Sequence, residues 1–265
     1  MQMNTTSAVT WIYRALGYTV YAVSQIIERN LHRRKTGGST LWVNPAQDDC
    51  WRAVNANCTS LKLFSQDYGC YSFLQGTGAD VEFSDFPQTN RQKYDWVIVN
   101  LPRQKALLAM MLDCAAALLA KDGVLWLAGE NKAGIKSADK QLKLHFGRLR
   151  KLDNARHCSL YEADTRLNQN PFEPLTYRQQ WPLNCKGPDI TVLSYPGIFA
   201  HGRLDDGTSL LLEALASMEL SGDVLDFACG AGLIGACIAA RHPDTRVTLL
   251  DVNALALRAC RETLE

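Results

Sequence analysis

Short apolar runs alternate along the chain with longer segments of helical periodicity. Residues 95–100 (Asp-Trp-Val-Ile-Val-Asn) form an apolar run with polar ends, which is typical of a buried parallel strand. Further short strands are expected at 41–44, 61–64, 124–128 and 157–161. Between them, residues 103–120 predict a helix, and a second helix is expected from Ser137, whose side chain would cap it. This alternation predicts an α/β fold with a parallel, doubly wound sheet.

A second α/β pattern begins after a proline-rich stretch. Five prolines fall within 168–197, a composition that suits a connection plus an antiparallel edge hairpin. Beyond it we expect a helix at 208–218, a strand at 223–227, a helix to about 241, a strand at 246–250 and a helix from 254. The predicted division is a first domain over 1–170 with 1–23 unassigned, a linker over 171–197 and a second domain over 198–265. Because parallel sheets usually contain about five or more strands, the second domain is expected to be incomplete in this chain.

Composition excludes several classes of protein. The 265 residues contain 28 Lys+Arg against 27 Asp+Glu and are 47% hydrophobic, which argues against disorder and against a wholly basic nucleic-acid binder. The apolar stretch 8–23 is too short and too interrupted for a membrane span or a signal peptide. Nine cysteines without close pairs predict reduced thiols in a cytoplasmic protein, with no membrane partner and no metal site.

A glycine turn carries the most informative chemistry. Gly230, Gly232 and Gly235 follow a predicted strand and open a predicted helix, so the backbone there can approach a nucleotide closely. Asp251 ends the next strand about 20 residues on, where an acid accepts both ribose hydroxyls. The spacing matches the dinucleotide fingerprint, which by itself is a weak motif.

Asp226, four residues before the first glycine, separates the two ligand classes that use such a turn. A pyrophosphate would be repelled by a nearby carboxylate, whereas S-adenosylmethionine carries no phosphate and is cationic at its methionine end. The pattern therefore favours S-adenosylmethionine, and the candidate cofactor residues are Asp226, Gly230, Gly232, Asp251 and Asn253. An NAD-dependent oxidoreductase and a turn that serves only helix packing stay open as alternatives.

Two segments of the second half, 197–212 (GIFAHGRLDDGTSLLL) and 224–232 (VLDFACGAG), resemble the ribosomal RNA small subunit methyltransferase C family. Segments 127–137 and 152–161 resemble its first half. The resemblance implies tandem Rossmann-like methyltransferase folds, of which only the second binds cofactor. It further implies methylation of the exocyclic N2 of a guanine in 16S rRNA, as part of rRNA processing in ribosome biogenesis. The expected partner is 16S rRNA or the small subunit; the large-subunit N2-guanine enzymes are a similar alternative.

The family's catalytic segment, Asn-Pro-Pro-aromatic, does not occur in these residues. Residues 95–104 resemble it, but Leu101 and Arg103 replace a proline and the aromatic, so Asn100 is interpreted as a relic. No catalytic residue is assigned, and the chain is expected to bind cofactor without transferring a methyl group. A truncated, non-catalytic paralogue that binds RNA and cofactor is the alternative. The resemblance also places Asp205 at the methionine end of the cofactor, although ordinary helix capping is an equal interpretation.

A basic run between residues 132 and 156 contains eight Lys and Arg against two Asp. Such a run suits phosphate contacts, whose affinity falls steeply with salt, although many basic runs are only solvated surfaces. Lys140 and Lys143 are expected to share a helix face. The predicted RNA-binding residues are Lys132, Lys136, Lys140, Lys143, Arg148 and Arg150.

Overall fold

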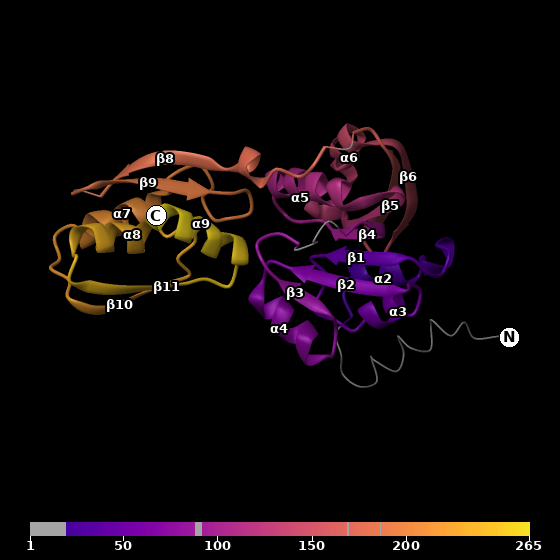
Figure 1. Cartoon of the computed structure of the whole chain (residues 1–265), viewed down its shortest axis with the longest axis horizontal. Helices are drawn as coiled ribbons and strands as arrows, with labels where there is room; N and C mark the ends of the chain where they lie inside the picture. Colours follow the sequence, from indigo (N-terminus) through magenta and orange to yellow (C-terminus); the bar gives the residue numbers. More distant parts are fainter. Residues whose placement is uncertain (1–19, 88–91, 169, 186) are drawn as a thin grey trace. The chain divides into compact units, whose positions relative to one another are not determined.

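The computed structural model describes residues 20–87, 92–168, 170–185 and 187–265 and divides into two compact units (Figure 1). The first unit runs to Phe172 and excludes two short segments, 66–68 and 84–86. The second unit comprises these two segments and residues 173–265. Residues 1–19, part of the segment left unassigned from the sequence, lie outside the described residues.

The first unit is built on a seven-stranded sheet with the order β3-β2-β1-β4-β5-β7-β6. Its strands are β1 (Ser39–Val43), β2 (Ser60–Ser65), β3 (Val81–Phe83), β4 (Tyr94–Asn100), β5 (Leu119–Glu130), β6 (Phe146–Ala155) and β7 (Cys158–Arg166). The α/β prediction is confirmed, but the sheet is not wholly parallel, since β7 runs antiparallel to both β5 and β6. The antiparallel pairing of β6 with β7 follows from the two-residue turn Arg156-His157, where both residues have positive φ, the geometry of a tight hairpin.

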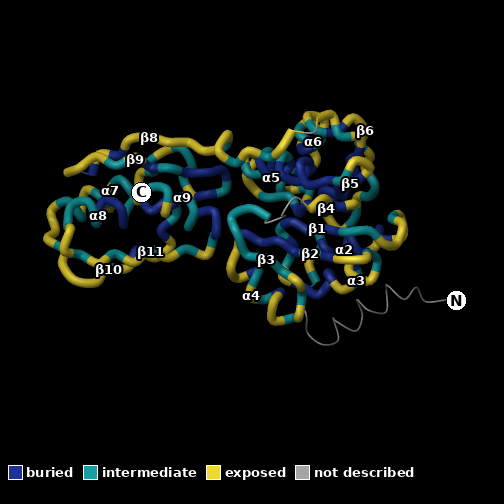
Figure 2. Tube along the Cα trace, in the orientation of Figure 1, coloured by how far each residue is buried: buried dark blue, intermediate teal, exposed yellow. Residues whose placement is uncertain are grey.

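Each central strand is buried on both sides because successive side chains point to opposite faces. Leu41, Val97 and Leu125 pack under α5 (Lys105–Leu118) and α6 (Asp139–His145). Their neighbours in sequence, Trp42, Ile98 and Trp126, lie on the face covered by α2 (Ala22–Glu28), α3 (Trp51–Asn55) and α4 (Tyr68–Gly76). Figure 2 shows the buried centre of this sheet in dark blue.

The basic segment after β5 differs from the sequence prediction. It begins with two 3-10 turns, η2 (Asn131–Ala133) and η3 (Ile135–Ser137), and the helix α6 is only seven residues long. Ser137 does not cap that helix: its hydroxyl donates to the carbonyl of Gly134 at 2.8 Å, and the capping position is Ala138. The following strand β6 was not predicted, because an edge strand with many exposed charged side chains shows no clear apolar alternation.

The second unit contains a two-stranded parallel sheet, β10 (Gly222–Phe227) with β11 (Thr245–Leu250), close to the predicted strands. Its helices are α7 (Asp206–Leu215), α8 (Leu233–Arg241) and α9 (Ala254–Leu264). The predicted edge hairpin is present as β8 (Gln179–Asn184) and β9 (Asp189–Ser194), after the 3-10 turn η4 (Pro174–Tyr177), and β9 packs on α9. One face of the β10–β11 pair is open, with Leu225, Phe227 and Leu250 exposed.

The prediction that all nine cysteines are reduced is wrong for one pair. Cys185, the residue after β8, forms a disulfide with Cys237 in α8, and the other seven cysteines are free. The two partners are 52 residues apart, so no local spacing marks them. They meet because the hairpin and α8 bring their Cα atoms to 5.3 Å, within the range a disulfide spans.

The described ranges hold neither a membrane span nor a metal cluster. None of the helices described there is both long enough and apolar enough to cross a membrane. In the same ranges, no group of three or more His, Cys, Asp or Glu side chains is arranged to bind a metal ion.

Candidate functional site

A cavity of about 420 Å³ lies in the second unit where the glycine turn, the end of β11 and the segment 197–208 meet. Of the predicted cofactor residues, Asp205, Gly230, Asp251 and Asn253 line this cavity. Asp226 and Gly232 do not line it and act from beneath the turn, as described below. The further lining residues used in the argument are Phe199, Arg203, Ala228, Cys229 and Ile234.

Asp251 joins the two loops that frame the cavity. One carboxylate oxygen accepts the N–H of Gly230 at 2.9 Å, and the other accepts the N–H of Asn253 at 2.8 Å. An ionised carboxylate offers about four lone-pair positions, so two contacts leave room for further donors. The side chain is therefore held in place by the protein while it can still accept hydroxyl groups of a ligand.

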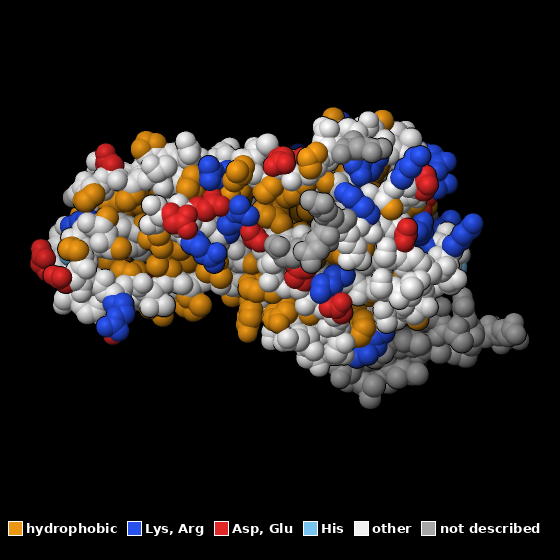
Figure 3. Space-filling model, viewed as in Figure 1, with side chains coloured by type: hydrophobic (Ala, Val, Ile, Leu, Met, Phe, Trp, Pro, Cys, Tyr) orange, Lys and Arg blue, Asp and Glu red, His pale blue; other side chains and the backbone are white. Residues whose placement is uncertain are grey.

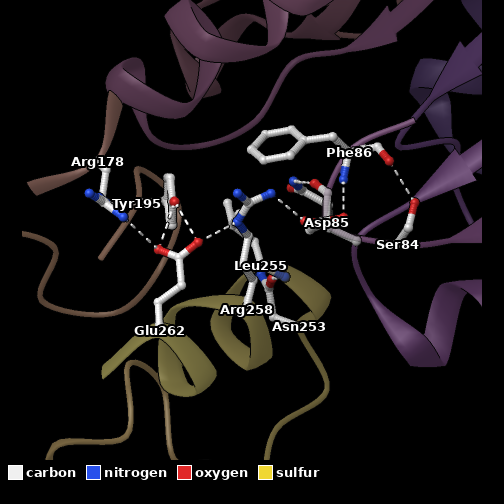
Figure 4. Close-up of polar contacts among 10 residues, drawn as sticks. Ser84, Asp85, Phe86, Arg178, Tyr195, Asn253, Leu255, Arg258 and Glu262 are labelled. Carbon is white, nitrogen blue, oxygen red and sulfur yellow. Dashed lines mark hydrogen bonds and ion pairs between the residues drawn. The ribbon is translucent and has the colours of Figure 1, made fainter. Parts of the chain in front are cut away.

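Asn253 fixes the start of α9 beside this acid. Its side-chain oxygen accepts the N–H groups of Leu255 at 2.8 Å and Ala256 at 3.3 Å, which is an N-cap (Figure 4). The same loop is paired with segment 66–68 of this unit: the N–H of Tyr68 donates to Val252 O, and the N–H of Ala254 donates to Gln66 O, both at 2.8 Å. The loop that follows Asp251 is thus held from both sides.

Farther along α9, Arg258 is the centre of a charged cluster (Figure 4). Its guanidinium lies 2.7 Å from the carboxylate of Asp85 and 2.8 Å from that of Glu262. Glu262 also accepts the hydroxyl of Tyr195 at 2.9 Å and lies 3.5 Å from Arg178. Burial disfavours the charge of Arg258, but hydrogen bonds to Glu262 and Asp85 outweigh this cost and raise its pKa. The cluster holds α9 against the hairpin and against segment 84–86.

Asp226 is buried under the glycine turn. Its carboxylate accepts the N–H of Gly235 at 2.9 Å, so it binds the first turn of α8. Burial raises the pKa of this carboxyl; the Gly235 hydrogen bond opposes that rise, and the nearby charge of Asp251 adds to it. Asp226 thus supports the turn in the structure, and its contact with a cationic ligand group stays a prediction.

Gly232 is required by both its conformation and its surroundings. It has φ of 81° and precedes α8 as the N-cap residue. A Cβ added there would lie 2.8 Å from the Sγ atom of Cys260 in α9. Two further residues of the turn have positive φ, Ala228 at 61° and Gly230 at 56°. Ala228 is the one of these three residues that is not a glycine, so the turn carries a cost in backbone strain there.

Cys229 lines the cavity, and its environment argues against a nucleophilic role. A hydrogen bond with the thiol of Cys260, burial and the charges of Asp226 and Asp251 all raise its pKa. Because the thiolate is the nucleophile, a raised pKa keeps this group neutral and unreactive. This environment suits a small residue that packs beside the turn.

Asp205, just before α7, both caps this helix and lines the cavity, so the two interpretations considered for it are compatible. Its side chain caps α7 by accepting the N–H groups of Gly207 at 3.1 Å and Thr208 at 3.2 Å, and it lines the cavity as well. The hydrogen bond with the Thr208 side chain, against some desolvation, lowers the pKa of Asp205, so the group is an anion at neutral pH. His201 instead pairs its ring with the Ser194 hydroxyl at 2.7 Å, outside the cavity lining.

One lining residue, Phe199, was not identified as a site residue from the sequence. Its ring is 73% exposed although it borders the cavity. It lies between Gly197, with φ of 101°, and Ala200, with φ of 51°. Neither the backbone geometry nor the exposure is visible in the sequence; the usable signal was that Phe199 lies within the segment 197–212, which resembles the family.

The predicted RNA-binding residues lie on four different elements, and Lys140 and Lys143 lie three residues apart on one helix, as expected. Lys132 and Lys136 lie on η2 and η3, Lys140 and Lys143 on α6, and Arg148 and Arg150 on β6, and all six are exposed. Figure 3 shows Lys and Arg side chains gathered over the β6 side of the first unit.

Three of these six cations are already paired with acids. Arg148 binds Asp164 at 2.6 and 2.7 Å, and Arg150 binds Glu162. Lys143 lies 3.4 Å from Asp139, one turn earlier on the same helix. Lys132, Lys136 and Lys140 therefore suit the predicted phosphate contacts better than the three paired cations do.

In the first unit, the strand end that resembles a catalytic segment has a structural partner. Asn100 is buried at the end of β4, and its side-chain oxygen accepts the indole N–H of Trp42 at 3.0 Å. The residue therefore stabilises the packing of β1 on β4, and its interpretation as a relic stays a prediction.

A strand, a glycine turn, a helix and an acid at the end of the neighbouring strand define the nucleoside-binding half of a Rossmann-like protein. Comparisons with known proteins identify the family of Rossmann-like proteins to which the chain belongs. Residues 24–181 match the family model described as methyltransferase small domain N-terminal, and residues 189–265 match that of the methyltransferase small domain. Together with the relatives described next, these matches show that the chain belongs to the ribosomal RNA small subunit methyltransferase C family.

The relatives agree with this assignment. The chain is 36% identical to the ribosomal RNA small subunit methyltransferase C of Aeromonas hydrophila over 245 residues, which is 92% of this chain and 71% of the relative. It is 49% identical to that of Pseudomonas entomophila over 173 residues, 64% of this chain and 51% of the relative. The solved T. thermophilus 16S rRNA N2 G1207 methyltransferase, in complex with AdoMet and guanosine, has the same fold at a TM-score of 0.80 and 19% identity. That match covers 94% of this chain and 67% of the other.

Proposed function

We propose that this chain binds the cofactor of an S-adenosylmethionine-dependent rRNA methyltransferase. The observation that carries the proposal is the cavity in which Asp251 links Gly230 to Asn253. The proposal is further supported by the family to which the chain belongs and by the names of its relatives, which describe enzymes that methylate small-subunit rRNA.

The donor set of the cavity fits S-adenosylmethionine. Asp251 would accept the ribose hydroxyls, Asn253 would keep the loop beside it in place, and the turn at Gly230 would approach the cofactor with its backbone. Asp205 supplies an anion for the ammonium group of the methionine end, and the cavity lining includes Arg203 for its carboxylate. The bound cofactor supplies a methyl group on a sulfonium. Asp226 and Gly232 complete the site by holding the turn on α8 and α9.

The proposed substrate is the exocyclic N2 of a guanine in 16S rRNA. This amino group is a weak nucleophile because its lone pair is delocalised into the ring, so positioning and desolvation supply most of the rate. The residues 1–265 contain no Asn-Pro-Pro-aromatic segment to accept hydrogen bonds from that amino group. We therefore propose that these residues bind the cofactor but do not transfer the methyl group by themselves.

Calorimetric titration with S-adenosylmethionine tests the site. The wild-type chain is expected to bind it, and Asp251→Asn is expected to weaken binding at least about tenfold, because a charge-assisted hydrogen bond contributes about 1.5–3 kcal/mol. Asp244→Asn is the matched control, since Asp244 is an exposed acid outside the cavity. Its affinity should equal that of the wild type.

Two results would contradict the proposal. Tight binding of NAD with no binding of S-adenosylmethionine would indicate a dinucleotide site instead. Equal affinities of Asp251→Asn and the wild type would show that the cofactor lies elsewhere. Methyl transfer to 16S rRNA by the 265-residue chain, assayed with labelled cofactor, would confirm the class of reaction and disprove the proposed lack of catalysis.

A further inference from the structure

A second cavity, of about 630 Å³, lies at one edge of the first unit. It is formed where β4 and β5 begin and β7 ends, which is the edge opposite the carboxyl ends of the parallel strands. Four cationic side chains line it against two carboxylates; the charged groups are Lys93, Lys121, Arg148 and Arg166 with Asp122 and Asp164. None of these cations except Arg148 was identified from the sequence.

The two carboxylates do not neutralise the cavity. Asp164 is paired with Arg148 at 2.6 and 2.7 Å, and Arg150 lies 3.7 Å from it. The Arg148 hydrogen bonds hold the pKa of Asp164 below its usual value despite its burial, so this acid stays ionised and committed to the arginines. Among the cavity's lining residues, Lys93, Lys121 and Arg166 therefore face only one further acid, Asp122.

Lys93 and Arg166 are held by backbone carbonyls, which fix their positions without cancelling their charge. The ammonium of Lys93 donates to the carbonyl of Ala117, near the end of α5. Arg166 donates to the carbonyl of Leu119 at 3.1 Å and to that of Asn168 at 3.0 Å. Each cation keeps unused donors, since Lys has three and Arg five. The cavity thus presents preplaced positive charge.

A bulge in β5 brings Lys121 to the same place. Tyr94 of β4 pairs with Leu119, and Trp96 pairs with Val124, so residues 120–123 are outside the ladder. Bulges commonly redirect side chains in this way. Gly123 permits it, because a Cβ there would lie 2.9 Å from the carbonyl oxygen of Tyr94. The result is an exposed lysine, Lys121, that lines the same cavity as Lys93 and Arg166.

We propose that this cavity binds phosphate groups of an RNA backbone, an inference that rests on the proposed rRNA substrate. Arginine and lysine donors fit phosphate oxygens, and protein–RNA affinity depends largely on such contacts. The volume exceeds the need of one phosphate, so the cavity accommodates a short stretch of backbone. It adds Lys93, Lys121 and Arg166 to the RNA-facing surface.

Fluorescence anisotropy with a labelled 16S rRNA fragment over a range of salt concentrations tests this inference. Lys121→Ala is expected to weaken binding roughly threefold and to reduce the salt slope by about one, and Lys121→Glu to weaken it further. Lys105→Ala is the matched control: Lys105 is an exposed lysine of the same unit at the start of α5, outside the cavity. It should bind like the wild type.

Titration with sodium pyrophosphate, followed by calorimetry, separates this inference from the proposed function. Binding of pyrophosphate that Lys121→Glu abolishes and Lys105→Ala retains supports the cavity even if the rRNA fragment does not bind, a result that would refute only the rRNA substrate. If the rRNA fragment binds equally to the wild type, Lys121→Glu and Lys105→Ala, the inference is overturned while the proposed function stands. If pyrophosphate binds the variants equally and the rRNA fragment does not bind, both the phosphate-binding cavity and the rRNA substrate are overturned.

Discussion

Two acids of the second unit, Asp226 and Asp251, perform different tasks because their surroundings differ. Asp251 lies at the cavity surface and binds backbone N–H groups of two loops. Asp226 is buried and binds one N–H group, that of Gly235. A single donor offsets little of the desolvation cost of a buried carboxylate, so the pKa of Asp226 rises. Asp226 therefore supports the turn but lowers the stability of the fold at neutral pH.

The substitution Asp226→Asn makes this cost measurable. The folded state binds the Asp226 proton more tightly than the unfolded chain does, and this tighter proton binding stabilises the fold. The stabilisation is complete below the unfolded pKa of about 3.9. The wild type loses this stabilisation as the pH rises through the higher pKa of the folded state. An asparagine side chain does not titrate and still offers an oxygen to Gly235. The variant should therefore gain stability relative to the wild type between about pH 4 and about pH 7.5.

Thermal unfolding of both proteins at the two pH values checks this expectation. Asp223→Asn is the control, because the Asp223 side chain is exposed and pairs with the exposed Arg246 at 3.4 Å. Parallel curves for Asp226→Asn and the wild type across the whole range would show that burial does not govern this carboxyl.

At the scale of elements, the second unit relies on links between helices and the hairpin more than on a wide sheet. Its parallel sheet has two strands, with Leu225 and Phe227 exposed on one face. The hairpin β8–β9 packs on α9, the Arg258 cluster holds α9, and the Cys185–Cys237 disulfide joins the hairpin to α8. These links position the start of α9 and the first turn of α8, which frame the cofactor cavity.

Reduction of the disulfide is therefore expected to destabilise the second unit. A cross-link that closes 52 residues restricts the unfolded chain by about 4 kcal/mol in the chain-entropy model, and somewhat less is common in practice. Cys185→Ser should lower the unfolding temperature, and dithiothreitol should lower that of the wild type by a similar amount. Dithiothreitol should leave Cys185→Ser unchanged. A wild-type protein indifferent to the reductant, with both thiols free by mass spectrometry, would contradict the cross-link.

At the scale of the whole molecule, the two units differ in how completely their strands are buried. In β4 and the second half of β5 nearly every residue between the ends is buried, with side chains packed on both faces. In β10 and β11 exposed residues recur throughout. Local stability follows buried apolar contact, so the first unit should be the more stable part.

Hydrogen exchange followed by mass spectrometry tests this difference. Amides of β1, β4 and β5 are expected to exchange at least about tenfold more slowly than those of β10 and β11, which corresponds to about 1.4 kcal/mol in opening free energy. Peptides from α5 serve as an internal reference for the buried core. Equal protection of the two sheets would mean that the open face of β10–β11 does not weaken it.

Local patterns alone predicted much of this protein. The buried run at 95–100, the glycine turn, Asp251 and the hairpin at the prolines all came from residues within a few positions of one another, where periodicity and backbone preference act directly. The same is true of Asp205, whose cap depends on the next three residues.

Tertiary structure decided the rest, because those features depend on distant parts of the chain. Asp226 binds the first turn of α8 because β10 places it under the glycine turn, and Cys185 meets Cys237 only when the hairpin docks on α8. The cationic cavity joins Lys93, Lys121 and Arg166 across three strands. Sequence by itself predicted most of the strands and the turn shaped for a nucleoside cofactor. The packing of the elements determined which side chains line a cavity and which support it.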